Sequence, residues 1–325
     1  MDKAYINNVQ YHLPEKIESN SEILQSAKYD NTKIDKMIEK IGIVSRRIAS
    51  DAEYSNDLGI IAGKKILKNY DSKQIQYLIF CTNTPEYSLP TNACIIQDKL
   101  GLEKNIGAID IILACSGYVY SLSLAKSLIL SDQAKQILLI TSDTYSKFIS
   151  KKDAGTRILF GDGATSTLIT NQKKTHGFEI KNFVYGTDGS GFQNAVIHNF
   201  GSRHWKNKVS SGDNLNLNGP GIYEFALKRV PEAVNVFLKK NSITLDEIDY
   251  FVFHQANKYI IDNLQSKLKI SKNKLLMNMN EIGNTSSSSI PIVLSKHLPK
   301  IKENKKILLI GFGGGLSWGI SLINS

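Results

Sequence analysis

Three side chains that could act together on a thioester each follow an apolar segment of the chain. Cys115 lies within Ala-Cys-Ser-Gly, His254 within His-Gln-Ala-Asn, and Asn284 within Gly-Asn-Thr-Ser. A cysteine thiol can carry an acyl group, while an imidazole and an amide can polarise a carbonyl. Residues 311–315, Gly-Phe-Gly-Gly-Gly, could bring backbone N–H groups close to a developing oxyanion. The combination predicts acyl transfer through a cysteine thioester.

Each of these residues also has a plainer interpretation when it is taken alone. A single cysteine is most often buried and inert, and an asparagine after glycine most often marks a turn. A histidine at a strand end can have a purely structural role, as a cap or as a core residue whose hydrogen bonds are all made within the protein. Cys115 lies between a strand and the start of a helix, where the helix dipole should lower the thiol pKa and favour the thiolate. Cys81 and Cys94 are predicted to be inert.

The composition limits the classes of protein to which the chain can belong. It has 325 residues, 42% of them hydrophobic, and a formal net charge of +10. The dispersed lysines predict a solvated surface, with a phosphate-bearing cofactor or an acidic carrier protein as the alternative explanation. A nucleic-acid-binding protein would concentrate this charge on one stripe or arm, so that class is disfavoured. The three cysteines lack the spacing of a zinc site. No segment reads as a leader or a membrane span, and we expect a soluble cytoplasmic protein.

Apolar, strand-like segments recur along the chain at a nearly constant offset. The offset is 173 residues from Tyr77 to Tyr250 and 170 residues from Ile137 to Ile307. This spacing predicts an internal duplication. The three pairs of predicted strands are 76–80 with 249–253, 109–113 with 275–279, and 137–140 with 307–310.

Helical patterns fill the gaps between these strands. Residues 117–130, 257–268 and 288–298 carry apolar side chains at helical spacing. Strands that alternate with helices predict parallel pairing and an α/β fold. We expect two duplicated halves, residues 1–170 and 171–325, packed face to face as five α-β-α-β-α layers. The Gly- and Asn-rich segment 186–221 is weakly periodic and is expected to contribute to a substrate mouth.

In their order and spacing, these motifs resemble the thiolase-fold condensing enzymes, specifically the β-ketoacyl-acyl-carrier-protein synthase III family. Further matching strings are Phe-Gly-Asp-Gly-Ala at 160–164 and Gly-Gly-Gly-Leu-Ser-Trp-Gly at 313–319. The resemblance implies a thiolase-like fold, a homodimer, and a catalytic triad of Cys115, His254 and Asn284. It also implies an oxyanion hole formed by the backbone N–H groups of Cys115 and Gly314. No metal or redox cofactor is implied, and CoA or phosphopantetheine thioesters are the expected substrates.

The resemblance further implies a two-step acyltransferase reaction. An acyl thioester, acyl-CoA or acyl-carrier protein, transfers its acyl group to Cys115. A malonyl thioester then loses carbon dioxide while His254 and Asn284 donate hydrogen bonds to its thioester carbonyl, which requires a proton on His254 Nε2. The enolate attacks the acyl group to give a 3-oxoacyl product, and the kinetics should be ping-pong. This places the chain in fatty-acid or related lipid biosynthesis.

The chain departs from the family pattern at the positions that would bind the CoA nucleotide or the carrier protein of a thioester substrate. Lys36 and Lys40 stand where family members carry a tryptophan and an arginine for the CoA adenine and phosphates. Ala154 replaces a second phosphate-binding arginine, and Lys258-Tyr259 replaces an arginine that grips the carrier protein. Lysine keeps the charge but loses the planar fork and its stacking.

Further candidates concern the acyl tunnel and the rest of the substrate mouth. Leu89, before Pro90, stands at the position of an aromatic gate. Asn257, Gly219 and Tyr223 complete the expected substrate contacts. Because the catalytic motifs are intact while the handle site differs, we expect a specialised member that uses a carrier-bound donor or an unusual acyl group.

Three alternatives remain open from the sequence. A thiolase-fold acyltransferase could pass the Cys115-bound acyl group to an oxygen or nitrogen nucleophile without decarboxylation, although the presence of both His254 and Asn284 argues against it. A non-catalytic subunit of a condensing heterodimer usually lacks the nucleophile, which is present here. A nucleic-acid-binding protein is suggested by net charge alone.

Overall fold

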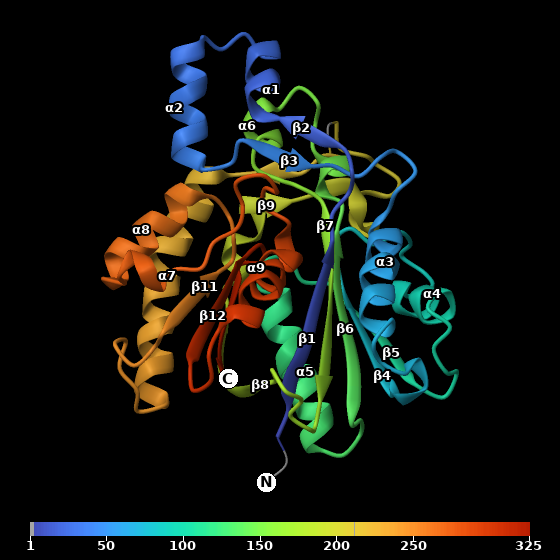
Figure 1. Ribbon diagram of the computed structural model, residues 1–325. Helices are drawn as coiled ribbons and strands as arrows, with labels where there is room; N and C mark the ends of the chain where they lie inside the picture. Colours follow the sequence, from blue (N-terminus) through green and yellow to red (C-terminus); the bar gives the residue numbers. More distant parts are fainter. Residues whose placement is uncertain (1–2, 211) are drawn as a thin grey trace.

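The computed structural model describes residues 3–210 and 212–325, and its main element is a large mixed sheet (Figure 1). The strands of this sheet are β1 (Tyr5–His12), β4 (Tyr77–Cys81), β5 (Gly107–Ile111), β6 (Gln136–Asp143), β7 (Gly163–Thr170), β8 (Phe178–Thr187), β11 (Tyr250–Phe253), β12 (Lys306–Gly313) and β13 (Ser317–Asn324). Within the described residues their order is β11-β12-β13-β8-β1-β7-β6-β4-β5. Two small ladders pair β2 (Ile17–Ser19) with β3 (Ser45–Arg47) and β9 (Ala195–Val196) with β10 (Asn216–Leu217).

The helices of the described chain fall into long helices and short 3₁₀ turns. The α-helices are α1 (Asn20–Ser26), α2 (Asn31–Ile41), α3 (Ser55–Leu67), α4 (Asn92–Lys99), α5 (Gly117–Leu130), α6 (Ala154–Arg157), α7 (Gly219–Lys240), α8 (Lys258–Leu268) and α9 (Ser289–His297). The 3₁₀ turns are η1 (Ser72–Gln74), η2 (Tyr145–Phe148), η3 (Gly189–Asn194), η4 (His198–Phe200), η5 (Ser202–His204), η6 (Lys272–Lys274), η7 (Ser286–Ser288) and η8 (Leu298–Lys300). Helix α5 matches the predicted helix 117–130, and α8 and α9 match the other two predictions to within a residue at each end.

The two ends of the sheet repeat one strand arrangement. On one side β4 runs parallel to β5 and β6, while β6–β7 and β7–β1 are antiparallel. On the other side β11 runs parallel to β12, while β12–β13 and β13–β8 are antiparallel. The repeats join where β1 pairs with β8, at Tyr5–Glu179 and Ile6–Phe178. This arrangement matches the duplication inferred from the offsets, whereas the boundary between residues 170 and 171 stays a prediction.

The predicted strand at 275–279 is wrong in extent. Leu275 makes only an isolated parallel bridge to Phe251, and Leu276 N–H donates to Phe251 O. Two residues further on, Asn278 N–H donates to the side-chain oxygen of Gln255 at 2.9 Å instead of to a strand. The segment therefore leaves the sheet after one bridge, because a side chain from the His-Gln-Ala-Asn motif takes the place of the neighbouring backbone.

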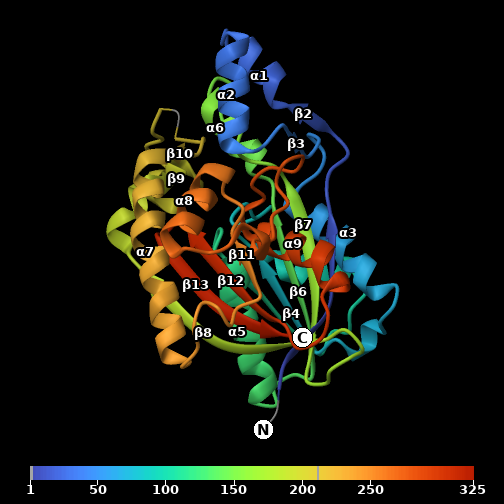
Figure 2. The ribbon, with the colours of Figure 1, turned by 60° about the vertical axis from the view of Figure 1, so that its left-hand side comes forward.

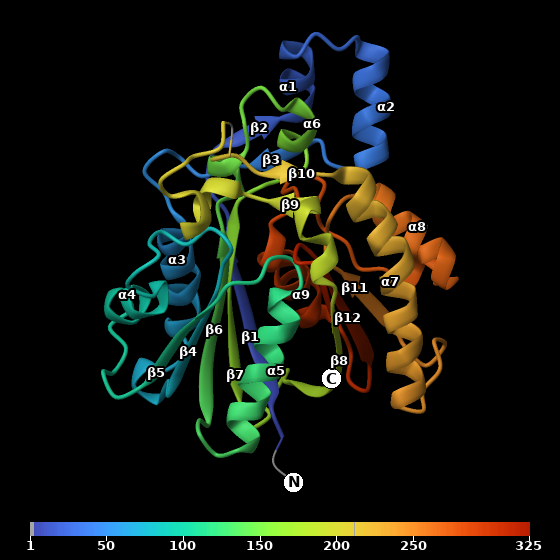
Figure 3. The same cartoon turned by 180° about the vertical axis from the view of Figure 1, so that it is seen from behind.

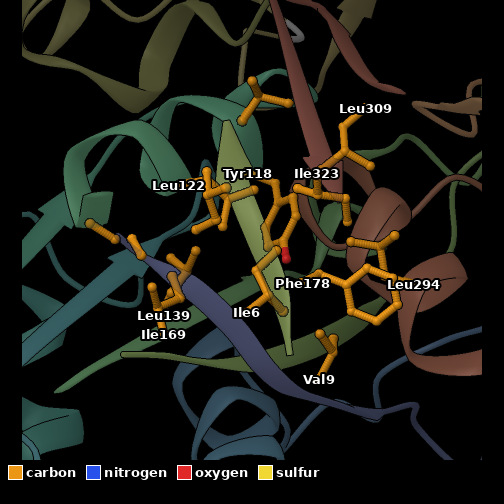
Figure 4. Close-up of a cluster of buried hydrophobic side chains, with 14 of the residues drawn as sticks. Ile6, Val9, Tyr118, Leu122, Leu139, Ile169, Phe178, Leu294, Leu309 and Ile323 are labelled. Carbon is orange, nitrogen blue, oxygen red and sulfur yellow. The ribbon is translucent and has the colours of Figure 1, made fainter. Parts of the chain in front are cut away.

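The three largest apolar cores of the described chain lie within an arrangement of five layers. Figure 3 shows α3 and α4 on one flank and α7 and α8 on the other, with α5 and α9 between the two halves of the sheet. In the central layer, Tyr118 and Leu122 of α5 meet Leu294 of α9 among side chains from both repeats (Figure 4). The chain thus has the thiolase-like α-β-α-β-α arrangement predicted from the sequence.

A helical hairpin formed by α1 and α2 projects from one end of these layers (Figure 2). Helix α2 begins after Asp30, whose side chain accepts a hydrogen bond from Lys33 N–H, and ends at Gly42 with φ +70°. Both are standard helix-terminating devices. None of the helices among residues 3–210 and 212–325 combines the length and the apolar character needed to cross a bilayer.

Ile66 and Ile61 of α3 provide a matched test of the outer packing. Ile66 is fully buried, whereas Ile61 is 37% exposed. Replacing Ile66 with alanine should lower the free energy of unfolding by about 2–5 kcal/mol, because a buried cavity is created. Ile61→Ala on the same helix should change it by less than about 1 kcal/mol. Chemical denaturation measures both values, and equal effects would contradict this packing.

Candidate active site

The three candidate catalytic residues line one cavity of about 420 Å³. Cys115 follows β5 and precedes α5, His254 follows β11, and Asn284 lies just before η7. Cys115 and His254 therefore stand beyond the carboxyl ends of parallel strands, which is where open α/β sheets bind ligands. Cys115 comes from one repeat of the fold and the other two residues from the second. The structure therefore brings the three residues to one cavity, and their catalytic roles stay a prediction.

Cys115 lines this cavity and is partly exposed to it. Its Sγ lies 3.9 Å from the Ser286 hydroxyl. A Cβ atom at Gly313 would lie 3.0 Å from the same sulfur, so glycine is needed there for the strand to pass the thiol. Burial raises the pKa of the Cys115 thiol to about 12, the nearby Asp143 carboxylate adds to the shift, and the Ser286 hydroxyl opposes it. The sequence-based prediction of a lowered thiol pKa is wrong, because desolvation outweighs the helix dipole.

His254 is buried and electrically neutral. Its Nδ1 lies 2.7 Å from the Ser289 hydroxyl, and Phe312 packs against its ring edge-to-face with centroids 5.5 Å apart. Burial lowers the pKa of the imidazole to about 3, and a hydrogen bond with the Ser286 backbone only partly opposes the shift. Near neutral pH the ring therefore carries one proton, which suits a neutral hydrogen-bond donor better than a cationic acid.

Asn284 is held in place through both its backbone N–H and its backbone carbonyl. Its N–H donates to Leu159 O at 2.8 Å, and its carbonyl accepts from Gly161 N–H at 3.0 Å. Its side-chain oxygen accepts from Ser286 N–H at 2.9 Å, so the amide NH₂ group remains to serve the cavity. Gly161 has no space for a side chain, because a Cβ there would lie 1.9 Å from Ile282 O. The Phe-Gly-Asp-Gly motif is thus a support for the Asn284 turn.

Two buried carboxylates support the site: Asp162 belongs to the Phe-Gly-Asp-Gly-Ala motif, whereas Asp143 was not singled out from the sequence. Asp162 accepts hydrogen bonds from Ala49 N–H at 2.8 Å and Ser146 N–H at 3.1 Å. Asp143 accepts from Asn83 N–H at 2.7 Å and from the Ser287 hydroxyl at 2.6 Å. Burial raises the pKa of both carboxyls to about 6. For Asp143, a charged residue at the end of the apolar segment 137–140 was the available signal.

The other predicted site residues divide into two groups. Gly314, Asn257 and Gly219 line the cavity. Asn257 also caps α8, because its side-chain oxygen accepts from Ile260 N–H at 2.9 Å. The remaining four, Leu89, Lys36, Lys40 and Tyr223, do not line the cavity.

Two of those outer residues belong to a stack at the surface. Lys40 Nζ lies 4.2 Å from the centroid of the Tyr259 ring, and Tyr259 stacks on Tyr223 with centroids 5.3 Å apart. This stack ties the hairpin helix α2 to α8 and α7. Leu89 is 86% exposed and does not line the cavity of its own chain.

The segment 186–221 forms one wall of the cavity, as expected for a substrate mouth. Residue 211 lies outside the described chain. The wall is apolar and comes from β9, β10 and the turns between them. Its members are Ala195, Val196, Ile197, Phe200, Leu215 and Leu217. Sequence reasoning also missed Asn83 and Tyr145, which line the same cavity; the Asn83 amide donates to the Tyr145 hydroxyl at 3.1 Å. Among residues 3–210 and 212–325, no group of three or more His, Cys, Asp or Glu side chains is arranged to hold a metal ion.

The raised pKa of Cys115 predicts slow alkylation at neutral pH. Because only the thiolate reacts, the rate of iodoacetamide modification at Cys115 should rise about tenfold per pH unit between about pH 7 and 10. Mass spectrometry of the Cys115 peptide separates this reaction from modification of the exposed Cys94. A rate that levels off below about pH 8 would contradict the dominance of burial.

Gly161 gives a second test of the site. Gly161→Ala forces a Cβ against a backbone carbonyl, so it should lower the free energy of unfolding by about 1–3 kcal/mol or more. Gly189→Ala is the matched control, because its Cβ would meet nothing within 4 Å. Thermal unfolding of both variants measures the difference. Equal melting temperatures would contradict the tight contact between the two motifs.

Comparison with known proteins places the chain in a family. Residues 109–189 match the family described as 3-oxoacyl-[acyl-carrier-protein (ACP)] synthase III. Residues 238–325 match the family described as the C-terminal part of the same enzyme. The matched ranges include all three candidate catalytic residues and the glycine run.

Similar full-length proteins and a solved structure agree with this assignment. A β-ketoacyl-[acyl-carrier-protein] synthase III of Clostridium perfringens is 38% identical over 286 residues, covering 86% of this chain and 87% of the relative. The corresponding protein of Lactococcus lactis subsp. cremoris is 34% identical and covers 100% of both chains. A crystal structure of a 3-oxoacyl-(acyl-carrier-protein) synthase III superposes with a TM-score of 0.90 at 36% identity, covering 99% of this chain and 100% of the other. The chain therefore belongs to the β-ketoacyl-[acyl-carrier-protein] synthase III family of condensing enzymes.

Proposed function

We propose that this chain transfers an acyl group from a thioester to Cys115 and then condenses it with a malonyl thioester, with loss of carbon dioxide. The observation that carries the proposal is the grouping of Cys115, His254, Asn284 and Gly314 around one cavity in a member of this family. The apolar wall from segment 186–221 suits an acyl chain, and the three candidate catalytic side chains line the same cavity.

In the first half-reaction, the Cys115 sulfur attacks the carbonyl carbon of an acyl thioester. The backbone N–H groups of Cys115 and Gly314 stabilise the tetrahedral oxyanion, an effect typically worth about 2.7–4 kcal/mol per donor. The C–S bond to the donor then breaks, and the proton of the Cys115 thiol ends on the departing thiol. The high pKa of Cys115 favours loss of this proton together with C–S bond formation and disfavours a standing thiolate.

In the second half-reaction, a malonyl thioester binds to the acyl-enzyme. His254 and Asn284 donate hydrogen bonds to its thioester carbonyl and stabilise the enolate that forms as carbon dioxide leaves. The enolate carbon attacks the acyl carbonyl, the bond to the Cys115 sulfur breaks, and a 3-oxoacyl thioester is released. The low pKa of His254 supports its action as a neutral donor.

The surface around the mouth supports a carrier-bound donor or an unusual acyl group. Lys40 is engaged with the Tyr259 ring, so its charge is partly directed away from an incoming nucleotide. Lys36 and Lys40 offer point charges where a planar arginine fork would otherwise grip phosphates. Leu89 in place of an aromatic residue would widen the acyl tunnel.

The exposed groups beside β5 support a homodimer. Strand β5 is an edge of the large sheet, and Ile112, which follows it, is 71% exposed and also lines the cavity. An unprotected edge strand next to exposed apolar side chains favours pairing with a second copy. In such a dimer the exposed Leu89, which does not line its own cavity, would be free to reach the other subunit.

Separate assays of the two half-reactions test the proposed function. His254→Ala and Asn284→Ala should each retain acylation of Cys115, measured by intact mass. Each should lower carbon dioxide release from a malonyl thioester by about 10²–10³-fold, the usual cost of losing one such donor. Ser288→Ala serves as the control, because its hydroxyl bonds Thr141 and Gly163 and no catalytic group.

The outcome distinguishes two reactions. Full acylation with no carbon dioxide release by the unmodified protein would contradict condensation and would favour acyl transfer to an oxygen or nitrogen nucleophile.

A preference between acyl donors follows from the substitutions at the positions that would bind CoA. We expect kcat/KM for an acyl-carrier thioester to exceed that for the same acyl-CoA by at least about tenfold, which corresponds to about 1.4 kcal/mol. Steady-state kinetics with both donors at matched salt provides the measurement. A kcat/KM with acetyl-CoA equal to that of a standard initiating enzyme would contradict the specialised role.

A further inference from the structure

The only side-chain hydrogen bond to His254 among the described residues comes from Ser289. The distance between His254 Nδ1 and Ser289 Oγ is 2.7 Å, and both residues are 2% exposed. Ser289 is the first residue of α9, and the helix packs into the central apolar layer, so its hydroxyl is held in place. Since Nδ1 faces α9, Nε2 is the ring nitrogen left to serve the cavity.

The partners of the Ser289 hydroxyl decide the direction of this bond. Gln255 N–H donates to the same oxygen at 3.3 Å. A hydroxyl has one hydrogen and two acceptor positions. Within the described chain the hydroxyl has no other acceptor than His254 Nδ1, so its hydrogen is directed to that nitrogen. Nδ1 must then hold a lone pair, and the single proton of the neutral ring must lie on Nε2.

We propose that Ser289 is a positioning residue that fixes His254 as the Nε2-protonated tautomer. This inference rests on the proposed function for its catalytic meaning, because the malonyl carbonyl needs a donor at Nε2. The other tautomer would place a lone pair against that carbonyl and would repel it. A histidine is usually set in this way by the bond that its second nitrogen makes.

The Ser286 backbone is the competing partner. It also hydrogen-bonds the imidazole, and a proton donated to it from Nδ1 would leave Nε2 without one. The Ser289 hydroxyl lies 2.7 Å from Nδ1, which is within ordinary hydrogen-bond distance. The two arrangements predict opposite protonation of the ring, so a direct measurement separates them.

Nuclear magnetic resonance of protein labelled with ¹⁵N-histidine reports the tautomer directly. The His254 signals are assigned by their loss in His254→Ala. We expect a protonated Nε2 and an unprotonated Nδ1 in the unmodified protein. Ser289→Ala should shift the signals toward a mixture of both tautomers, and Ser289→Thr, which keeps the hydroxyl, should restore the original pattern. Ser288→Ala is the matched control, because it removes a neighbouring buried hydroxyl that does not touch His254.

The activity readout follows from the same variants. Ser289→Ala should lower carbon dioxide release from a malonyl thioester on the order of 10- to 100-fold, by analogy with the loss of partners that orient metal-bound histidines. Acylation of Cys115 should not change. Thermal unfolding confirms that each variant is folded at the temperature of the assay.

Two results would overturn the inference. One is a proton on Nδ1 in the unmodified protein, and the other is an unchanged tautomer in folded Ser289→Ala. If the tautomer responds to Ser289 while the unmodified protein releases no carbon dioxide from any malonyl thioester, the positioning role stands and the proposed function fails.

Discussion

Two backbone hydrogen bonds between the Asn284 turn and residues 159–161 join the repeats where the cavity forms. Asn284 N–H donates to Leu159 O at 2.8 Å and Gly161 N–H donates to Asn284 O at 3.0 Å. Cys115 belongs to the first repeat, and His254 and Asn284 belong to the second. Their relative positions therefore depend on this contact, which has space only for glycine at position 161. The duplicated fold provides the two sets of strand ends, and this contact holds them next to each other.

Desolvation then sets the chemical state of the groups in the cavity. Burial raises the pKa of Cys115 and lowers that of His254, so both are neutral at ordinary pH. Asp143 has no ion-pair partner in the described chain and is stabilised by hydrogen bonds from Asn83 and Ser287. A site of neutral donors suits an enolate intermediate, because N–H groups can stabilise developing negative charge without protonating it.

Much of the fold and of the site could be predicted because it depends on local patterns. The 117–130 periodicity gave the bounds of α5, and the motifs around Cys115, His254 and Asn284 identified the cavity residues. The strand predicted at 275–279 failed because Gln255, remote in sequence, binds the Asn278 backbone. The predicted direction of the Cys115 pKa shift was wrong, because a helix start can be recognised in the sequence whereas the burial of a side chain cannot. Ser289 and Asp143 were missed for a similar reason, since serine and aspartate act here only through partners from other elements.

Intact mass spectrometry after incubation with a panel of acyl-CoA and acyl-carrier thioesters, without malonyl substrate, tests the central claim most directly. We expect a gain of one acyl group per chain with at least one donor, and no gain in Cys115→Ala. The donor that reacts would also show whether the site accepts CoA or a carrier protein as the thiol part of the thioester. An acyl adduct that persists in Cys115→Ala, or no adduct with any donor, would contradict the assignment of Cys115 as the nucleophile.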